Sequence, residues 1–192
     1  FLWRGEINFV RPEEWDTFFS EYETWIVQMA TLAEAEHAEV FCVGLEYSYA
    51  EKYEERWRKI IAAVRAVYHG KVTYGANWNQ YAEVKFWDAL DYIGMLAYFP
   101  LTKTVDPSVS EIAAAWEKRC AELEKFSKQN GKQLIFTEIG YNESARAAAE
   151  PWAFKTGGEH ATEIQARCID TALGLPAKHP FLAGMYWWKW FP

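Results

Sequence analysis

Short apolar runs alternate with longer amphipathic stretches along the chain, and this alternation limits the fold more than any other feature of the sequence. The apolar runs are typical of strands that are buried on both faces of a sheet. They are Val40–Val43, Val72–Tyr74, Tyr92–Tyr98, Leu134–Thr137 and Phe181–Trp188. Between most of these runs, apolar residues recur at helical spacing. Strands that alternate with helices indicate βαβ crossovers, and therefore a parallel sheet of the α/β class.

The amphipathic stretches predict the positions of the helices. Apolar positions from Tyr53 to Tyr68 recur at helical spacing and stop at Gly70, and a short helical stretch covers Lys85–Leu90. Ser108 and Glu111 stand at capping-box spacing and open a long helix. A further helix contains Ile164–Leu173 and ends near Gly174. Four tryptophans at helical positions are expected to pack in the core: Trp15, Trp25, Trp57 and Trp116.

The length of the chain bears on the kind of α/β fold. A doubly wound sheet usually carries a glycine-rich phosphate turn, and the sequence contains none, which favours a (β/α)8 TIM barrel. A complete barrel takes about 250 residues, or about 31 per βα unit, so 192 residues hold about six units. The five apolar runs above and a further strand near the N-terminus account for these six βα units. We therefore expect one domain over residues 1–192, an incomplete barrel truncated at its N-terminus that lacks about the first two βα units.

Composition excludes several classes of partner. The net charge is −7, which argues against a nucleic-acid partner. No apolar run approaches the ~18 residues of a membrane span, so we expect a soluble domain with no membrane partner. The three cysteines form no CxxC pair and the four histidines no HExxH pattern, so neither a metal site nor a cofactor is indicated. The sequence does not specify an oligomeric state.

Two glutamates stand where catalytic groups lie in a barrel, at the point where a strand ends and the following loop begins. Glu46 follows the run that ends in Gly44-Leu45, and Glu138 follows Phe136-Thr137. Glycoside hydrolysis requires two carboxyl groups, one to protonate the leaving oxygen and one to attack the anomeric carbon or activate water. The alternative is that each glutamate only caps the helix that follows.

Aromatic residues support a carbohydrate substrate. Trp, Tyr and Phe together make up 18% of the chain. Trp and Tyr present large rigid surfaces to the apolar faces of sugar rings, and each has a hydrogen-bonding edge. Aromatic residues and one asparagine near strand ends are therefore candidates for binding a polysaccharide or oligosaccharide. They are Asn77, Trp78, Tyr98, Tyr141, Trp188 and Trp190.

Several motifs resemble, in this order, those of glycoside hydrolase family 113. They are Gly44-Leu45-Glu46, Tyr74–Trp78, Phe86–Gly94, Ala97–Leu101, Phe136–Tyr141 and Trp187–Trp190. The resemblance extends from Trp3-Arg4-Gly5 to Trp190. It implies a clan A (β/α)8 barrel and a retaining endo-β-1,4-mannanase.

The resemblance also implies roles for individual residues. Glu46 would end the fourth barrel strand as acid/base, and Glu138 the seventh as nucleophile. Tyr98 would hydrogen-bond the nucleophile, and Trp188 would form the floor of the subsite that holds the reacting sugar. Asn77 and Trp78 would contact substrate at the end of the fifth strand.

The sequence departs from the clan pattern at Leu45. Many clan A enzymes have Asn immediately before the acid/base, where it contacts the sugar 2-hydroxyl, and an apolar residue loses that hydrogen bond. Two alternatives stay open: another clan A glycosidase that acts on glucan or xylan, and a barrel fragment that binds carbohydrate without catalysis.

Overall fold

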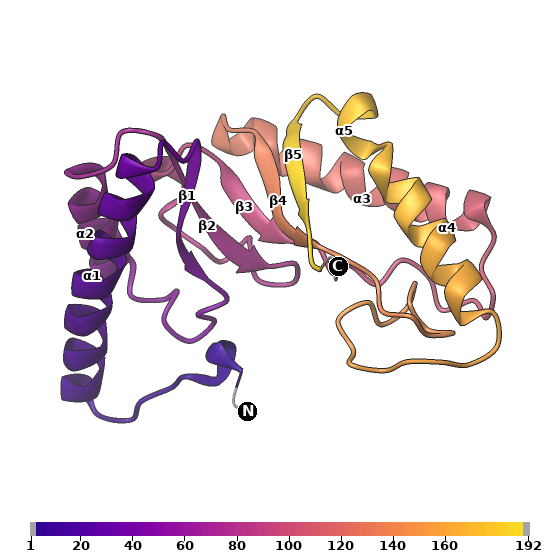
Figure 1. Cartoon of the computed structure of the whole chain (residues 1–192), viewed down its shortest axis with the longest axis horizontal. Coiled ribbons are helices and arrows are strands. Elements are labelled where there is room, and N and C mark those ends of the chain that lie inside the picture. Colours follow the sequence, from indigo (N-terminus) through magenta and orange to yellow (C-terminus); the bar gives the residue numbers. More distant parts are fainter. Residues whose placement is uncertain (1–2, 190–192) are drawn as a thin grey trace. The chain divides into compact units, whose positions relative to one another are not determined.

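The structure is a computed structural model that describes residues 3–189, and its elements confirm the α/β class (Figure 1). In chain order the elements are η1 (Arg4–Glu6), α1 (Pro12–Ala35), β1 (Val40–Leu45), α2 (Glu54–Arg65), β2 (Lys71–Asn77), η2 (Trp87–Ala89), β3 (Ile93–Leu96), α3 (Val109–Asn130), β4 (Leu134–Ile139), α4 (Ala161–Leu173), α5 (Leu175–Lys178) and β5 (Leu182–Trp187). The strand order in the sheet is β1-β2-β3-β4-β5. The pairs β1–β2 and β4–β5 are parallel. The chain divides into two compact units, residues 1–94 and 95–192.

The five predicted strands are all present, whereas the further strand expected near the N-terminus is wrong. Within the described residues, η1 and α1 occupy that part of the chain. The helix α1 agrees with the helical position predicted for Trp15, because its buried residues Trp15, Phe19, Tyr22 and Ile26 recur every three or four residues. That spacing places them on one face of a helix, but on alternating faces of a strand. The described residues therefore contribute five strands to the barrel rather than six.

Two predicted helices are shorter than expected. The apolar spacing extends to Tyr68, but α2 ends at Arg65. The stretch Lys85–Leu90 contains only the three-residue 3-10 turn η2. Tyr68 is nevertheless buried, and its hydroxyl donates to the carbonyl of Ala38 at 2.6 Å. The side chain therefore packs as the pattern predicts, although the helical backbone has already ended.

Aromatic side chains form the core of the first unit. The helices α1 and α2 lie side by side next to β1 and β2 (Figure 1). Trp57 is fully buried, and its ring lies 5.7 Å from that of Phe19 and 5.1 Å from that of Tyr74. Trp15 is also buried as predicted, but Trp25 is 51% exposed, which corrects its assignment to the core. Trp25 lies one position before Ile26, about 100° away from the buried stripe of α1.

Gly44 lets the last part of β1 pass close to these rings. A Cβ atom at this position would lie 2.7 Å from Trp57 and 2.8 Å from Tyr74. Contacts this short would force the rings or the strand to move. Glycine therefore allows the strand to reach Glu46 along its present path.

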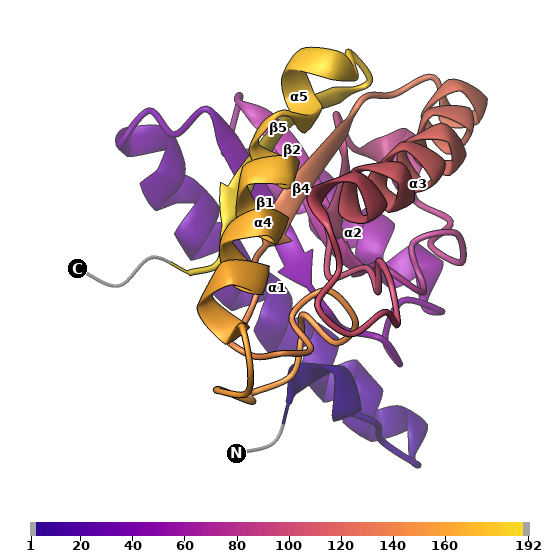
Figure 2. The same cartoon turned by 90° about the vertical axis from the view of Figure 1, so that its right-hand side faces the viewer.

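The second unit packs α3 and α4 against each other beside β4 and β5 (Figure 2). The capping box predicted at the start of α3 is confirmed, because the Ser108 hydroxyl accepts from the backbone of Glu111 and the Glu111 side chain accepts from that of Ser108. Gly131 ends the helix with φ at 63°. Trp116 is 1% exposed and contacts Phe136 of β4, as predicted for a core residue.

Candidate active site

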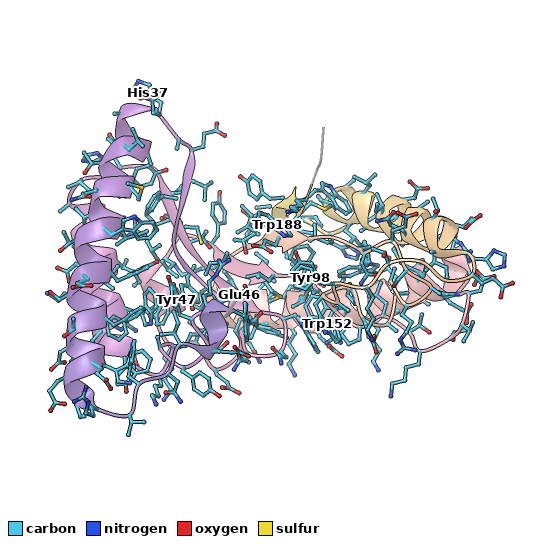
Figure 3. All side chains as sticks on the ribbon, turned by 60° about the horizontal axis from the view of Figure 1, so that its bottom comes forward. His37, Glu46, Tyr47, Tyr98, Trp152 and Trp188 are labelled. Carbon is cyan, nitrogen blue, oxygen red and sulfur yellow. The ribbon has the colours of Figure 1, made fainter. Side chains whose placement is uncertain are left out.

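Glu46 is the first residue after β1 and has an unusual backbone conformation. Its φ is 57°, in the left-handed region that residues with a Cβ seldom adopt. Its N–H donates to the carbonyl of Gly75 in β2 at 2.9 Å. The side chain is half-buried (Figure 3). The carboxyl group therefore leaves the sheet at a backbone turn that the pairing with β2 holds in place.

The environment of the Glu46 carboxyl group favours its protonated form. Burial raises the pKa of Glu46 above the usual glutamate value. The indole N–H of Trp3 donates to Oε2 at 2.9 Å, and this bond and the positive charge of Arg4 both lower the pKa in opposition to burial. Sequence analysis did not assign Trp3 to the site. Its 43-residue separation from Glu46 left no local signal that could have identified it.

The other candidates of the first unit lie at the end of β2 and beside Glu46. Asn77 is 8% exposed, and its amide donates to the hydroxyl of Ser48, in the loop after Glu46, at 3.2 Å. Trp78 follows and is half-buried. Leu45 is the last residue of β1 and is half-buried as well. The structure thus brings Asn77 to the loop that carries Glu46, through Ser48.

Glu138 in β4 has a tyrosine donor. The hydroxyl of Tyr98 donates to Oε2 of Glu138 at 2.9 Å, the contact that the family resemblance implies. The backbone of Ala97 also donates to the carbonyl of Glu138, at 2.7 Å, which ties the segment after β3 to β4. This hydrogen bond fixes the orientation of the Glu138 carboxyl group.

Trp188 lies next to the end of β4. Its backbone N–H donates to the carbonyl of Ile139 at 2.9 Å, and its side chain is 54% exposed (Figure 3). A Cβ atom at Gly140 would lie 1.9 Å from the carbonyl oxygen of Trp188, so this approach requires glycine. The peptide bond between Trp188 and Lys189 is cis. Trp190, the other candidate of this segment, lies outside the described residues.

Tyr141 is a packing residue rather than an exposed platform. It is 8% exposed, and its hydroxyl accepts from the indole of Trp116 in α3 at 3.2 Å. Its carbonyl accepts from Gln165 in α4 at 2.8 Å. Burial raises the pKa of Tyr141 well above the usual tyrosine value. Sequence analysis placed Tyr141 among the substrate contacts because it stands near the end of a strand, but its side chain is buried and bonded to Trp116 of α3.

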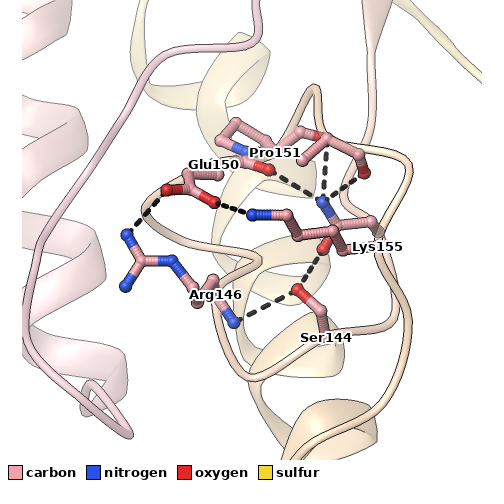
Figure 4. A network of polar contacts seen from close by, with 7 residues as sticks. Ser144, Arg146, Glu150, Pro151 and Lys155 are labelled. Carbon is pink, nitrogen blue, oxygen red and sulfur yellow. Dashed lines mark hydrogen bonds and ion pairs between the residues drawn. The ribbon is translucent and has the colours of Figure 1, made fainter.

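The loop after β4 carries two exposed aromatic residues that sequence analysis did not select, Trp152 and Phe154. The amide of Asn142 holds this loop by donating to the carbonyls of Glu150 and Ala153 (Figure 4). Glu150 also forms ion pairs with Arg146 and Lys155, which stabilise the same loop (Figure 4).

The described part of the chain contains no cluster of three or more His, Cys, Asp or Glu side chains that could hold a metal ion. In residues 3–189, no helix has both the length and the apolar character needed to cross a bilayer. At β1 and β4, the carboxyl groups of Glu46 and Glu138 accept hydrogen bonds from the indole of Trp3 and the hydroxyl of Tyr98, respectively.

A parallel α/β sheet with a half-buried glutamate after one strand and a tyrosine-bonded glutamate in another has the features of the glycosidase barrel class. The chain belongs to Glycoside Hydrolase Family 113, which its sequence matches over residues 1–192. Among curated protein sequences, none matches the chain.

Solved structures agree with this membership. The GH113 β-mannanase AaManA from Alicyclobacillus acidocaldarius, in complex with ManMIm, is 32% identical with a TM-score of 0.84, and the match covers 99% of this chain and 60% of that one. A GH113 β-1,4-mannanase complex is 30% identical with a TM-score of 0.84, covering 98% of this chain and 59% of that one. The chain thus spans about 60% of the length of these structures.

A more distant structure shares the fold alone. The β-glucuronidase of Bifidobacterium dentium, complexed with coumarin-3-O-glucuronide, is 17% identical with a TM-score of 0.63. The match covers 88% of this chain and 27% of that one. Together with the two mannanase structures, this match identifies the five-stranded sheet as part of a (β/α)8 barrel.

Proposed function

We propose that the chain carries the catalytic residues of a retaining, endo-acting glycoside hydrolase that cleaves β-1,4-mannan-type polysaccharides. The observation that carries the proposal is the hydrogen bond from the Tyr98 hydroxyl to Glu138, which orients the carboxyl group proposed as nucleophile. Burial raises the pKa of Glu46, which suits a proton donor. Family membership and the mannanase structures supply the substrate class.

The reaction proceeds in two steps. In the first, a carboxylate oxygen of Glu138 attacks the anomeric carbon while Glu46 gives its proton to the departing glycosidic oxygen. The Tyr98 hydroxyl orients the attacking carboxylate. In the second step, Glu46 takes a proton from water, the water oxygen attacks the anomeric carbon, and the bond to Glu138 breaks. Two inversions retain the configuration of the sugar.

Aromatic and amide side chains near the two glutamates would bind the polysaccharide. Trp188 would form the floor beneath the reacting sugar, and its half-exposed ring next to β4 supports this role. Asn77 and Trp78 would contact substrate from the end of β2. Leu45 offers no hydrogen bond to a sugar hydroxyl, so the role played by Asn in other clan members falls to another group or is absent.

The substitution Glu138→Ala tests the mechanism. It should abolish hydrolysis while the circular dichroism spectrum stays unchanged, because the half-exposed side chain contributes little to packing. Reducing-sugar release from mannan measures turnover, and the anomer formed first, followed by NMR, reports retention. The matched control is Glu159→Ala, since that side chain is 90% exposed and lies outside the site. Near-normal activity of Glu138→Ala would sink the mechanism.

The alternatives have distinct outcomes in the same experiment. Preferential hydrolysis of glucan or xylan over mannan would keep the mechanism and change the substrate. Binding of mannan without hydrolysis, measured by affinity electrophoresis, would favour a barrel fragment that binds carbohydrate.

A further inference from the structure

The backbone of Glu46 is held from both sides by neighbouring residues of β2. A left-handed φ of 57° at a residue with a long side chain persists only where the surroundings impose it. The peptide group before Cα is tied by the Glu46 N–H, which donates to the Gly75 carbonyl at 2.9 Å. The peptide group after Cα is tied by the Tyr47 N–H, which donates to the hydroxyl of Tyr74 at 3.0 Å. Because each bond fixes one of the two peptide planes, together they set both φ and ψ of Glu46.

The hydroxyl of Tyr74 is oriented by a buried carboxyl group. Tyr74 is fully buried, and its hydroxyl donates to Oε1 of Glu51 at 2.9 Å. A phenol has a single proton, so donation to Glu51 leaves the oxygen free to accept from Tyr47. Glu51 is 6% exposed and belongs to the same loop as Glu46. The Glu51 carboxyl group therefore decides which way the Tyr74 hydroxyl points.

The loop itself closes on the same residue, Tyr47. The backbones of Ala50 and Glu51 donate to the carbonyl of Tyr47 at 2.8 and 3.0 Å. Both the N–H and the carbonyl of Tyr47 are thus bonded, immediately after Glu46. The hydrogen bonds run from Glu51 through the Tyr74 hydroxyl to Tyr47 and so reach the residue that carries the proposed proton donor.

Packing alone does not account for these polar groups. The ring of Tyr74 contacts Trp57 and Phe86, and a phenylalanine would fill the same space. Burying a hydroxyl and a carboxyl group is unfavourable unless they are hydrogen-bonded. Here they are bonded to each other and to one backbone N–H, that of Tyr47.

We propose that Tyr74 and Glu51 are positioning residues for Glu46, which hold its backbone in the left-handed conformation that aims its carboxyl group at the glycosidic oxygen. This role rests on the proposed function, in which Glu46 is the proton donor. A displacement of about 1 Å in a reacting group can lower a rate by about two orders of magnitude. Loss of the hydroxyl therefore affects catalysis more than substrate binding.

The substitution Tyr74→Phe removes the hydroxyl and leaves the ring in place. In the full chain we expect kcat to fall at least about tenfold with KM changed less than about twofold. Hydrogen exchange of the Tyr47 amide should accelerate at least about fivefold, because its acceptor is lost. The backbone NMR shifts of Glu46 should move as its φ relaxes. Glu51→Leu, which removes the acceptor of the Tyr74 hydroxyl, should change all three readouts in the same direction.

Tyr68→Phe is the matched control. It removes another buried tyrosine hydroxyl from the same unit, one that bonds the Ala38 carbonyl before β1 begins. It should leave kcat, the Tyr47 exchange rate and the Glu46 shifts near their original values. Equal effects of Tyr74→Phe and Tyr68→Phe on these readouts would overturn the positioning role. A chain that hydrolyses no polysaccharide would contradict the proposed function instead, while the exchange rate and the shifts would still decide whether Tyr74 holds Glu46.

Discussion

At the scale of the residue, Glu51 links stability to pH. Burial raises the pKa of its carboxyl group to about 7; the hydrogen bond from Tyr74 lowers it and the nearby negative charge of Glu83 adds to the increase. The usual value of 4.5 applies to the unfolded chain. Because its pKa is raised in the folded state, the carboxyl group contributes stability in full below about pH 4.5, where it is neutral in both the folded and the unfolded chain. This contribution is lost as the pH rises from about 4.5 through about 7.

We expect Glu51→Gln to remove this dependence. A shift of one pKa unit corresponds to about 1.4 kcal/mol, so the charged carboxyl group costs the folded state roughly 3 kcal/mol above pH 7. Relative to that of the original chain, the free energy of unfolding of the variant should be larger at pH 8 than at pH 5 by up to about 3 kcal/mol. Urea denaturation at both pH values measures it.

The control for this prediction is Glu55→Gln on α2, where the side chain is exposed. Its effect should be the same at pH 5 and pH 8. If Glu51→Gln also showed no dependence on pH, the buried carboxyl group would not be the source of the linkage.

At the scale of the element, the sequence predicts where α3 begins as well as that it is a helix. The capping box at Ser108 depends on residues three positions apart, and the structure contains both of its hydrogen bonds. The N-terminal strand fails at the same scale. There the expectation came from a count of barrel units, whereas the spacing of Trp15, Phe19 and Tyr22 on α1 indicates a helix.

Ser108→Ala should destabilise the second unit by about 1 kcal/mol, because it leaves a backbone donor in the first turn of α3 without its acceptor. The midpoint of urea denaturation, compared at unchanged slope, measures the loss. Ser20→Ala, at an exposed position inside α1, is the control and should cost less or even stabilise the chain. Equal losses for both variants would show that the cap contributes nothing beyond an ordinary surface serine.

At the scale of the whole molecule, residues 3–189 carry five strands of an eight-stranded fold, and the chain spans about 60% of the related mannanase structures. Side chains from the remaining strands of a barrel also face its mouth. The test is a fusion protein, in which the chain is joined to the part of the Alicyclobacillus acidocaldarius barrel that it does not span. We expect this fusion to hydrolyse mannan faster than the chain by itself.

Reducing-sugar release from mannan by the two proteins, at equal concentration, measures this difference. The Glu138→Ala form of the joined protein is the control, and it should be inactive if the activity comes from the proposed nucleophile. Equal rates for the chain with and without the added part would show that these five strands and their loops suffice.

The α/β class, the five strands and the capped start of α3 follow from the sequence by itself, because they depend on residues that are near one another in the chain. The two glutamates also follow, since each stands directly after an apolar run. The resemblance to a family, rather than any local pattern, indicated the bond between Tyr98 and Glu138.

Only the tertiary structure decided which side chains surround these glutamates. Trp3 reaches Glu46 across 43 residues, Tyr74 reaches Glu51 across 23, and Trp116 reaches Tyr141 across 25. Such contacts depend on the register between strands and on the path of the chain after each strand. Neither is encoded by periodicity, which specifies the face on which a residue lies but not the partner that it meets there.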